Sequence, residues 1–121
     1  MRNNKFMRLT AEEASEHFSK LMSEAELQNN VIDLAHILGW KIVHFRPAMT
    51  LRGWRTPVSA DGKGFIDLVL VRDRVIWAEC KTERGVITSE QQNWHSWLIA
   101  AKQEAYIWRP KDLEKIKQIL T

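Results

Sequence analysis

Three charged residues stand near the ends of two apolar segments, where charged side chains are unusual. Asp67 is the one polar residue of segment 65–71, and Glu79 and Lys81 lie near the end of segment 75–81. Both segments have strand composition and a short polar turn separates them, which predicts a β-hairpin that brings Asp67 near Glu79. Alternate residues of a strand share a face, so Glu79 and Lys81 should point the same way and Cys80 the opposite way.

This arrangement indicates metal-dependent hydrolysis of a phosphodiester. Two neighbouring carboxylates repel each other, and a hard divalent cation such as Mg²⁺ relieves that repulsion. A cation held by Asp67 and Glu79 would lower the pKa of a bound water. Lys81 would position or deprotonate that water and offset charge on a phosphoryl oxygen. The spacing also fits a structural alternative, in which Asp67 ends its strand at an exposed turn and Glu79 and Lys81 form a surface salt bridge.

The basic residues are concentrated ahead of Asp67. The 121-residue chain has a formal net charge of +3, yet no acidic residue lies between Asp33 and Asp61. Basic groups mixed with aromatic ones suit a phosphate backbone and unstacked bases, although a solvated basic loop has the same composition. The residues that we expect to contact DNA are Lys41, Arg46, Arg52, Trp54 and Arg55, with Arg84 after the second strand.

Composition narrows the class of protein further. The chain is 45% hydrophobic and 27% charged, which is typical of one folded domain. Its single cysteine, Cys80, excludes a disulfide within the chain and a zinc site of paired cysteines. No apolar run reaches the roughly 18 residues of a membrane helix, and no apolar core of a signal peptide follows the basic N-terminus. We therefore expect a cytoplasmic protein that does not contact membranes.

The periodicity predicts an α/β fold with a central mixed β-sheet flanked by helices. We expect helices over 10–22, 23–38, 88–102 and 110–120, and strands over 41–45, 65–71, 75–81 and 104–108. Residues 47–64 read as a long loop. Of the six tryptophans, Trp77, Trp94, Trp97 and Trp108 are expected in the core, whereas Trp40 and Trp54 are candidates for ligand contact.

Several ordered motifs resemble the PD-(D/E)XK nuclease superfamily, and more narrowly its VRR-NUC branch of small phage and bacterial nucleases. They are Gly64–Asp67, Glu79–Lys81, Thr88–Gln91 with Trp94, and the segment 105–113. The resemblance covers about residues 23–115. It implies a restriction-endonuclease-like α-β-β-β-α-β core in a single nuclease domain over 23–121, preceded by a helical extension over 1–22. One departure is Ile66, which stands where the motif has proline.

The resemblance also implies roles for individual residues. Asp67 and Glu79 would be ligands of Mg²⁺, for which Mn²⁺ can substitute, together with the main-chain carbonyl of Cys80. Lys81 would be the catalytic lysine, and Gln91 matches a glutamine near the active site. An acidic residue on the first core helix often completes the metal shell. Glu26 is the best match for it, with Glu24 and Gln28 as alternatives.

Two of these residues have competing structural explanations. With Thr88 as N-cap, Gln91 occupies the third position of a capping box. With Ser23 as N-cap, Glu26 likewise occupies the third position of a capping box and would interact favourably with the helix dipole. Sequence alone leaves both explanations open.

The expected function is that of a metal-dependent endodeoxyribonuclease specific for branched or junction DNA. Relatives of this kind pair to cut two strands, so we expect a homodimer in the cytoplasm of a bacterial or phage-infected cell, with helix 10–22 serving the interface. The alternative is a non-catalytic DNA-binding or accessory module that keeps the fold. A sequence-specific restriction enzyme ranks lowest, because the chain has no room for a target-recognition domain.

Overall fold

The structure, a computed structural model, describes residues 9–45, 48–51, 53–55 and 58–121. Within these ranges the side chains of residues 48–50, 54 and 55 are also left undescribed. The helices are α1 (Ala11–Leu21), α2 (Glu24–Ile37), α3 (Ser89–Ala100) and α4 (Leu113–Leu120), which the 3₁₀ turn η2 (Pro110–Asp112) precedes. The strands are β1 (Lys41–His44), β2 (Ala48–Thr50), β3 (Gly53–Arg55), β4 (Leu68–Val71), β5 (Val75–Cys80) and β6 (Glu104–Trp108).

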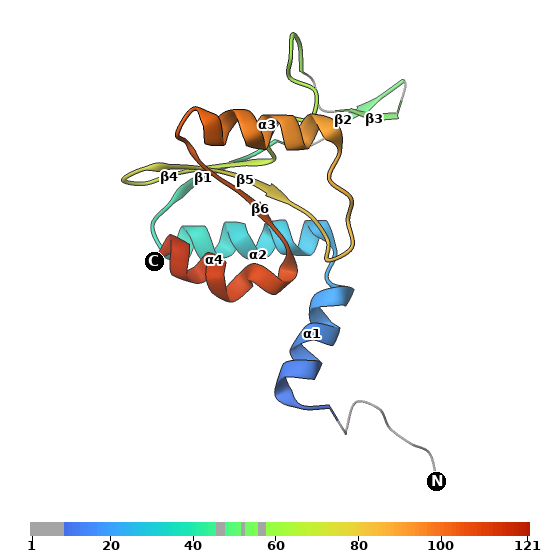
Figure 1. Ribbon diagram of the computed structural model, residues 1–121, viewed down its shortest axis with the longest axis vertical. Helices are drawn as coiled ribbons and strands as arrows, with labels where there is room; N and C mark the ends of the chain where they lie inside the picture. The colour runs from blue at the N-terminus through green and yellow to red at the C-terminus, as the bar shows by residue number, and fades with distance from the viewer. Residues whose placement is uncertain (1–8, 46–47, 52, 56–57) are drawn as a thin grey trace.

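The described residues form a mixed four-stranded sheet in the order β1-β4-β5-β6. The pairs β1–β4 and β4–β5 are antiparallel, and β5–β6 is parallel. Helices α2 and α4 cover one face of the sheet and α3 covers the other (Figure 1). The predicted α/β fold with a mixed sheet between helices is therefore confirmed.

The hydrophobic core lies between the sheet and the α2–α4 layer. Helix α2 contributes a buried stripe of Leu27, Val31 and Ala35, spaced to fall on one face. The alternate strand residues that meet it are Leu68, Leu70, Ile76, Ala78 and Cys80, and α4 adds Ile116 and Leu120. Across the described residues, no helix is long and apolar enough to cross a membrane.

Capping boxes start three of the helices at the predicted residues. Thr10, Ser23 and Thr88 each accept a hydrogen bond from a backbone N–H three residues later. In each case the side chain of that later residue accepts from the N-cap backbone in return. Two otherwise unpaired donors are thus satisfied at each helix start, which fixes where the helices begin.

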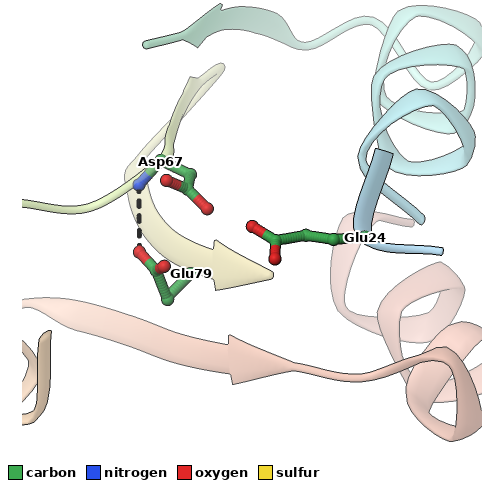
Figure 2. Close-up of side chains that lie close together, drawn as sticks. All are labelled: Glu24, Asp67 and Glu79. Atoms are coloured by element: carbon green, nitrogen blue, oxygen red, sulfur yellow. Dashed lines mark hydrogen bonds between the residues drawn. The ribbon is translucent and has the colours of Figure 1, made fainter. Parts of the chain in front are cut away.

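The strand expected over 65–71 was wrong in its first three residues. Strand β4 begins at Leu68, so Asp67 lies just before the strand and not inside it (Figure 2). The backbone N–H of Phe45 still donates to the carbonyl of Asp67 at 2.9 Å. This bond ties Asp67 to the segment after β1 at the end of the sheet, although Asp67 lies outside the regular ladder.

The expected loop over 47–64 was also wrong in part, because β2 and β3 pair there as a short antiparallel hairpin. The tryptophan predictions fail at two positions. Trp40 is 2% exposed and belongs to the core, where its indole N–H donates to the Leu120 carbonyl at 2.8 Å. Trp97 is 53% exposed on the outer side of α3. The burial of Trp40 and Trp97 thus depends on tertiary contacts and could not be predicted from the local sequence pattern.

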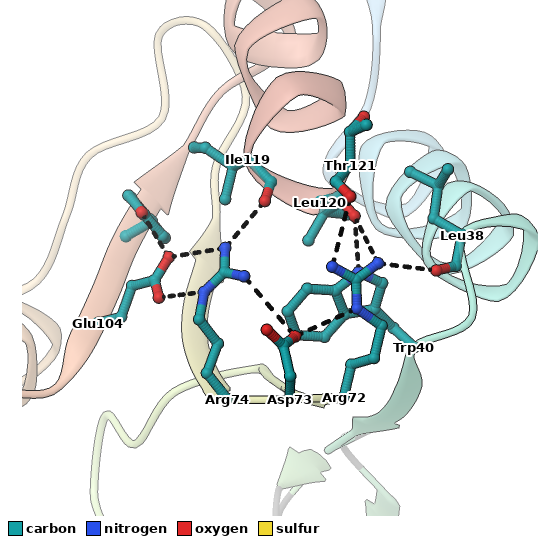
Figure 3. A network of polar contacts seen from close by, with 10 residues as sticks. Leu38, Trp40, Arg72, Asp73, Arg74, Glu104, Ile119, Leu120 and Thr121 are labelled. Atoms are coloured by element: carbon teal, nitrogen blue, oxygen red, sulfur yellow. Dashed lines mark hydrogen bonds and ion pairs between the residues drawn. The ribbon is translucent and has the colours of Figure 1, made fainter.

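Two arginines of the β4–β5 turn connect the sheet to the carboxyl ends of α2 and α4 (Figure 3). Arg72 donates to the carbonyls of Leu38 at 3.0 Å and Leu120 at 3.1 Å, and its guanidinium lies 4.5 Å from the Trp40 ring centroid. Arg74 donates to the Ile119 carbonyl at 2.9 Å. The last carbonyls of a helix have no partner within it, and cations there are stabilising.

Replacing Arg72 by alanine should therefore destabilise the protein. We expect Arg72→Ala to lower the free energy of unfolding by about 1–2 kcal/mol, because several helix-end carbonyls lose their donor. Urea unfolding followed by circular dichroism measures the change. Arg84→Ala, at an exposed loop position, serves as control and should change stability by less than about 0.5 kcal/mol. Equal effects of the two substitutions would contradict this role of Arg72.

Candidate metal centre

Asp67 and Glu79 meet at the end of the β4–β5 hairpin that lies opposite its turn. Glu79 is the next-to-last residue of β5 and is 1% exposed. Its carboxylate oxygen Oε2 accepts a hydrogen bond from the backbone N–H of Asp67 at 3.3 Å. Strand alternation turns Glu79 away from the α2–α4 core that contains Ala78 and Cys80. The predicted approach of the two carboxyl groups is confirmed.

A third carboxylate comes from the other side of the sheet. Glu24, the first residue of α2, points between Asp67 and Glu79 (Figure 2). One oxygen of each of these three groups lies within 4.8 Å of the others. We call Glu24, Asp67 and Glu79 the acidic cluster.

The acidic cluster fits a small hard cation. Two oxygens that share one Mg²⁺ lie at most about 4.2 Å apart, because each Mg–O distance is about 2.1 Å. The spread of 4.8 Å in the cluster is close to this limit. The donors are all carboxylate oxygens, which Mg²⁺ and Mn²⁺ prefer over nitrogen or sulfur. Small side-chain movements are enough to bring the three groups onto one ion.

Two side-chain amides orient the carboxylates. The Nε2 of Gln91 donates to Oε1 of Glu79 at 2.8 Å, and the Nε2 of Gln28 donates to Oδ2 of Asp67 at 3.3 Å. The Oε1 of Gln91 also accepts from the backbone N–H of Thr88 at 3.1 Å. The two interpretations of Gln91 are therefore compatible, since one side chain completes the capping box and reaches Glu79.

A close backbone approach places Asp67 relative to α3. Gly64 has a φ of +75°, and a Cβ at this position would lie 2.5 Å from the Cβ of Glu90 and 2.9 Å from the backbone nitrogen of Gln91. Any larger residue would push the chain away from the start of α3. Glycine at 64 thus lets the segment leading to Asp67 contact the helix that carries Gln91.

Burial and crowding raise the pKa values of all three acidic groups. Desolvation, followed by the charge of Asp67, raises the pKa of Glu79 to about 9. Desolvation is also the main cause that raises the pKa of Asp67 and that of Glu24. The Lys81 ammonium opposes each of these shifts, so its positive charge lies near the whole cluster. In the metal-free protein Glu79 therefore retains a proton well above the usual range of carboxylic acids.

Glu26 lies away from the cluster. Its side chain is exposed and accepts from the backbone N–H of Ser23 at 3.3 Å, while the Ser23 hydroxyl accepts from the backbone N–H of Glu26 at 3.1 Å. Among the three candidates on this helix, Glu24 enters the cluster and Gln28 contacts Asp67. Glu26 cannot join them, because residues two positions apart on a helix point about 200° from each other.

Cys80 and Lys81 follow Glu79 at the end of β5. The Cys80 thiol is buried in the core, and desolvation raises its pKa further above the ordinary value. The Cys80 side chain thus packs within the hydrophobic core. The backbone N–H of Lys81 donates to the carbonyl of Trp108 at 2.9 Å, which continues the β5–β6 ladder by one bond. This bond fixes the backbone from which the Lys81 side chain extends.

The expected DNA-contacting residues are only partly described. Lys41 on β1 and Arg84 after β5 are both exposed. Arg46 and Arg52 lie outside the described residues, and so do the side chains of Trp54 and Arg55, whose backbones belong to β3. A common basic surface therefore stays a prediction.

Sequence reasoning missed Arg109. Its Nη1 donates to the carbonyls of Thr82 at 2.6 Å and Gly85 at 2.9 Å, and it also contacts the carbonyl of Glu83. These bonds hold the loop that follows Lys81 and contains Arg84. The residue gives no local signal, because its partners lie more than twenty positions away in the chain.

Comparisons with models of protein families, with curated proteins and with solved structures found no match. A functional assignment therefore depends on the residues and geometry of the site itself.

The raised pKa of Glu79 predicts a pH-dependent stability for the metal-free protein. Between pH 4.5, the ordinary pKa, and about 9, folded Glu79 binds a proton that the unfolded chain has lost. Stability should therefore fall as the pH rises through this window, by on the order of 2–4 kcal/mol. Urea unfolding in EDTA at several pH values measures this slope. Glu79→Gln should flatten it and stabilise the protein at pH 8.

Exposed Glu114 provides the matched control for this experiment. Glu114→Gln should keep the wild-type slope, because a solvated carboxylate has similar protonation in the folded and unfolded states. If Glu79→Gln kept the slope as well, Glu79 would not hold a proton in the folded protein.

Proposed function

We propose that this protein is a metal-dependent endodeoxyribonuclease that hydrolyses DNA phosphodiester bonds. The observation that carries the proposal is the acidic cluster, in which three carboxylates from separate segments converge beside Lys81. Carboxylates so close together are unfavourable in the absence of a cation. The resemblance of the sequence motifs to PD-(D/E)XK nucleases, which includes Asp67, Glu79 and Lys81, supports the same function.

Asp67, Glu79 and Glu24 would hold Mg²⁺ or Mn²⁺, with the main-chain carbonyl of Cys80 as a further oxygen ligand. The cation would lower the pKa of a water and stabilise negative charge on the phosphate. Gln91 and Gln28 keep the carboxylates oriented toward the site through the hydrogen bonds described above. Amides suit this task because they donate to a carboxylate without adding charge.

Lys81 would act on the proton of the attacking water and on the phosphoryl oxygen. Its position beside the three carboxylates is supported by its effect on the pKa of each. A lysine ammonium can donate hydrogen bonds to a developing negative charge, and in its neutral form it can accept a proton. Arg84, held near Lys81 by the loop that Arg109 organises, would contact a neighbouring phosphate.

We propose branched or junction DNA as the preferred substrate. A panel of four-way junction, flap, nicked and linear DNA, incubated with and without Mn²⁺, tests both parts of this proposal. We expect Mn²⁺-dependent cleavage that is fastest on a branched substrate. Lys81→Ala should slow cleavage by at least about 100-fold, since it removes a group that acts on the reacting atoms.

Lys63 is the matched control for Lys81. It is an exposed lysine whose ammonium pairs at 3.3 Å with Glu90, which is not a member of the acidic cluster. Lys63→Ala should keep cleavage within about threefold of wild type, because exposed ion pairs contribute little. Absence of cleavage on every substrate would favour a non-catalytic DNA-binding module. Full activity of Lys81→Ala would show that the site is assigned wrongly.

A second pair of variants tests which acid of α2 binds metal. Glu24→Gln should weaken Mn²⁺ binding, measured by isothermal titration calorimetry, by about tenfold or more, because one charged ligand is lost. Glu26→Gln should bind Mn²⁺ as the wild type does, since glutamine preserves the capping box. The opposite result would assign Glu26 to the metal shell and Glu24 to the surface.

A further inference from the structure

A pocket of about 380 Å³ lies outside the hydrophobic core, where the loop of residues 58–62 meets the second turn of α3. Figure 1 shows this loop beside α3, on the side of the sheet opposite α2 and α4. The rings of Phe65 and Trp94 line the pocket together with all five residues of the loop. Its volume falls within the range of sites that bind small organic molecules.

Polar and aromatic contacts hold the Trp94 ring in place. Its indole Nε1 donates to the carbonyl of Asp61 at 3.1 Å, which joins α3 directly to the loop. The rings of Phe65 and Trp94 meet nearly perpendicular to each other, with centroids 4.9 Å apart and planes at 86°. Phe45 and Trp77 contact the Phe65 ring in similar perpendicular geometry. Both rings of the pocket are therefore fixed, and the one polar atom of the Trp94 side chain already has a partner.

Backbone contacts define the loop side of the pocket. The N–H of Gly62 donates to the Ser59 carbonyl at 3.0 Å, and the N–H of Phe65 donates to the Gly62 carbonyl at 3.0 Å. A Cβ at position 62 would lie 2.7 Å from the Cβ of Val58, so the loop closes on itself because residue 62 is glycine. A ligand would thus enter a preformed site and would not have to order its walls.

The chemistry of the lining favours a neutral, flat ring over a phosphate. Among the described residues, no basic side chain lines the pocket, and the carboxylate of Asp61 would repel an anion. Aromatic side chains stack well on flat heterocycles, and a nucleobase accompanies every phosphodiester bond of a nucleic acid. The pocket therefore suits a base better than it suits the backbone of the same strand.

The pocket and the acidic cluster are built from the same two segments. Gln91, which donates to Glu79 at 2.8 Å, precedes Trp94 by three residues and so lies on the same side of α3. Phe65 precedes Asp67 by two residues, which places their Cα atoms at most about 7 Å apart. A base in the pocket would thus belong to a nucleotide at or next to the phosphate bound at the acidic cluster.

We infer that this pocket binds one unpaired nucleobase of the DNA strand that is cut at the acidic cluster, with the base against Phe65 and Trp94. The inference rests on the proposed nuclease function and adds the feature of the substrate that the protein recognises. A base inside a duplex is paired and stacked, so it must leave the helix before it can enter a pocket. This costs least where the nucleotide is already unpaired. The protein therefore binds a flap more tightly than a fully paired four-way junction.

A flap substrate with a single 2-aminopurine, placed at each unpaired position in turn, tests where a base stacks. The fluorescence of 2-aminopurine falls when it stacks on an aromatic ring. The titrations contain Ca²⁺, which binds carboxylate oxygens, and a denaturing gel verifies that the DNA stays intact. We expect quenching at the one or two unpaired positions nearest the scissile phosphate, and little change further along the flap.

An abasic nucleotide measures the contribution of the base without a change in the protein. At the quenched position it should raise the dissociation constant of the wild type by about 5- to 100-fold, which is the range for stacking of one base on an aromatic side chain. At a distant unpaired position it should change the constant by less than about twofold. This titration keeps the inference testable even if a variant of the pocket does not fold.

Variants of α3 test which ring contacts the base. Trp94→Leu should abolish the quenching and raise the dissociation constant for the intact flap by the same 5- to 100-fold, whereas Trp94→Phe, which keeps a ring, should stay within about threefold of wild type. Trp97 is the matched control, because it is a tryptophan of the same helix, is 53% exposed and does not line the pocket. Trp97→Leu should change the constant by less than about twofold, and circular dichroism verifies that each variant is folded.

Combining the two changes tests whether Trp94 and the base contact each other. With the abasic flap, Trp94→Leu should weaken binding by less than about twofold, because the contact is already lost. Equal effects of Trp94→Leu on the intact and abasic flaps would overturn the pocket. So would equal effects of Trp94→Leu and Trp97→Leu on the intact flap, or equal affinity of the wild type for both flaps.

The same substrates separate failure of the pocket from failure of the proposed function. If any of these contrary results accompanies Mn²⁺-dependent cleavage by the wild type, the nuclease proposal stands and only the pocket is wrong. A wild type that neither binds nor cleaves any of the DNA substrates would overturn the proposed function and this inference with it.

Discussion

The crowding of three carboxylates at one end of the β4–β5 hairpin is the constraint on which the rest of the structure depends. Glu79 is almost fully buried and touches Asp67, and Glu24 approaches both from another helix. Desolvation of these groups, together with their mutual repulsion once they ionise, opposes folding in the absence of a cation. The surrounding elements must therefore supply the binding energy that keeps the groups together. Gln28 and Gln91 do so locally, since each donates to one carboxylate from a different helix.

The other end of the same hairpin carries favourable charge contacts. There, Arg72 and Arg74 satisfy carbonyls at the ends of α2 and α4, and Trp40 packs beneath both guanidinium groups. The favourable and unfavourable charge arrangements thus lie at opposite ends of two strands. Between them, the apolar core of β4 and β5 makes the hairpin stiff enough to hold both. A cation site needs this stiffness, because loosely held carboxylates would move apart and become solvated.

The local patterns predicted the helices, the capping boxes at Ser23 and Thr88, and the pairing of Asp67 with Glu79, because these depend on residues close in the chain or on strand alternation. They failed where a distant partner decides the outcome. Trp40 was a candidate for ligand contact, but its indole N–H meets Leu120 eighty residues later. Glu24 and Glu26 could not be separated by spacing, since the choice depends on how α2 is rotated against the sheet. Arg109 gave no signal, since its three carbonyl acceptors lie in a distant loop.

The choice of Glu24 over Glu26 has a consequence for how the site is assembled. Ser23 and Glu26 form a capping box that fixes the first turn of α2 through backbone bonds. The buried stripe of Leu27, Val31 and Ala35 then sets the rotation of α2, in which Glu24 reaches the cluster and Glu26 is exposed. Glu26 thus affects the acidic cluster indirectly, because its bonds with Ser23 fix the backbone from which Glu24 extends.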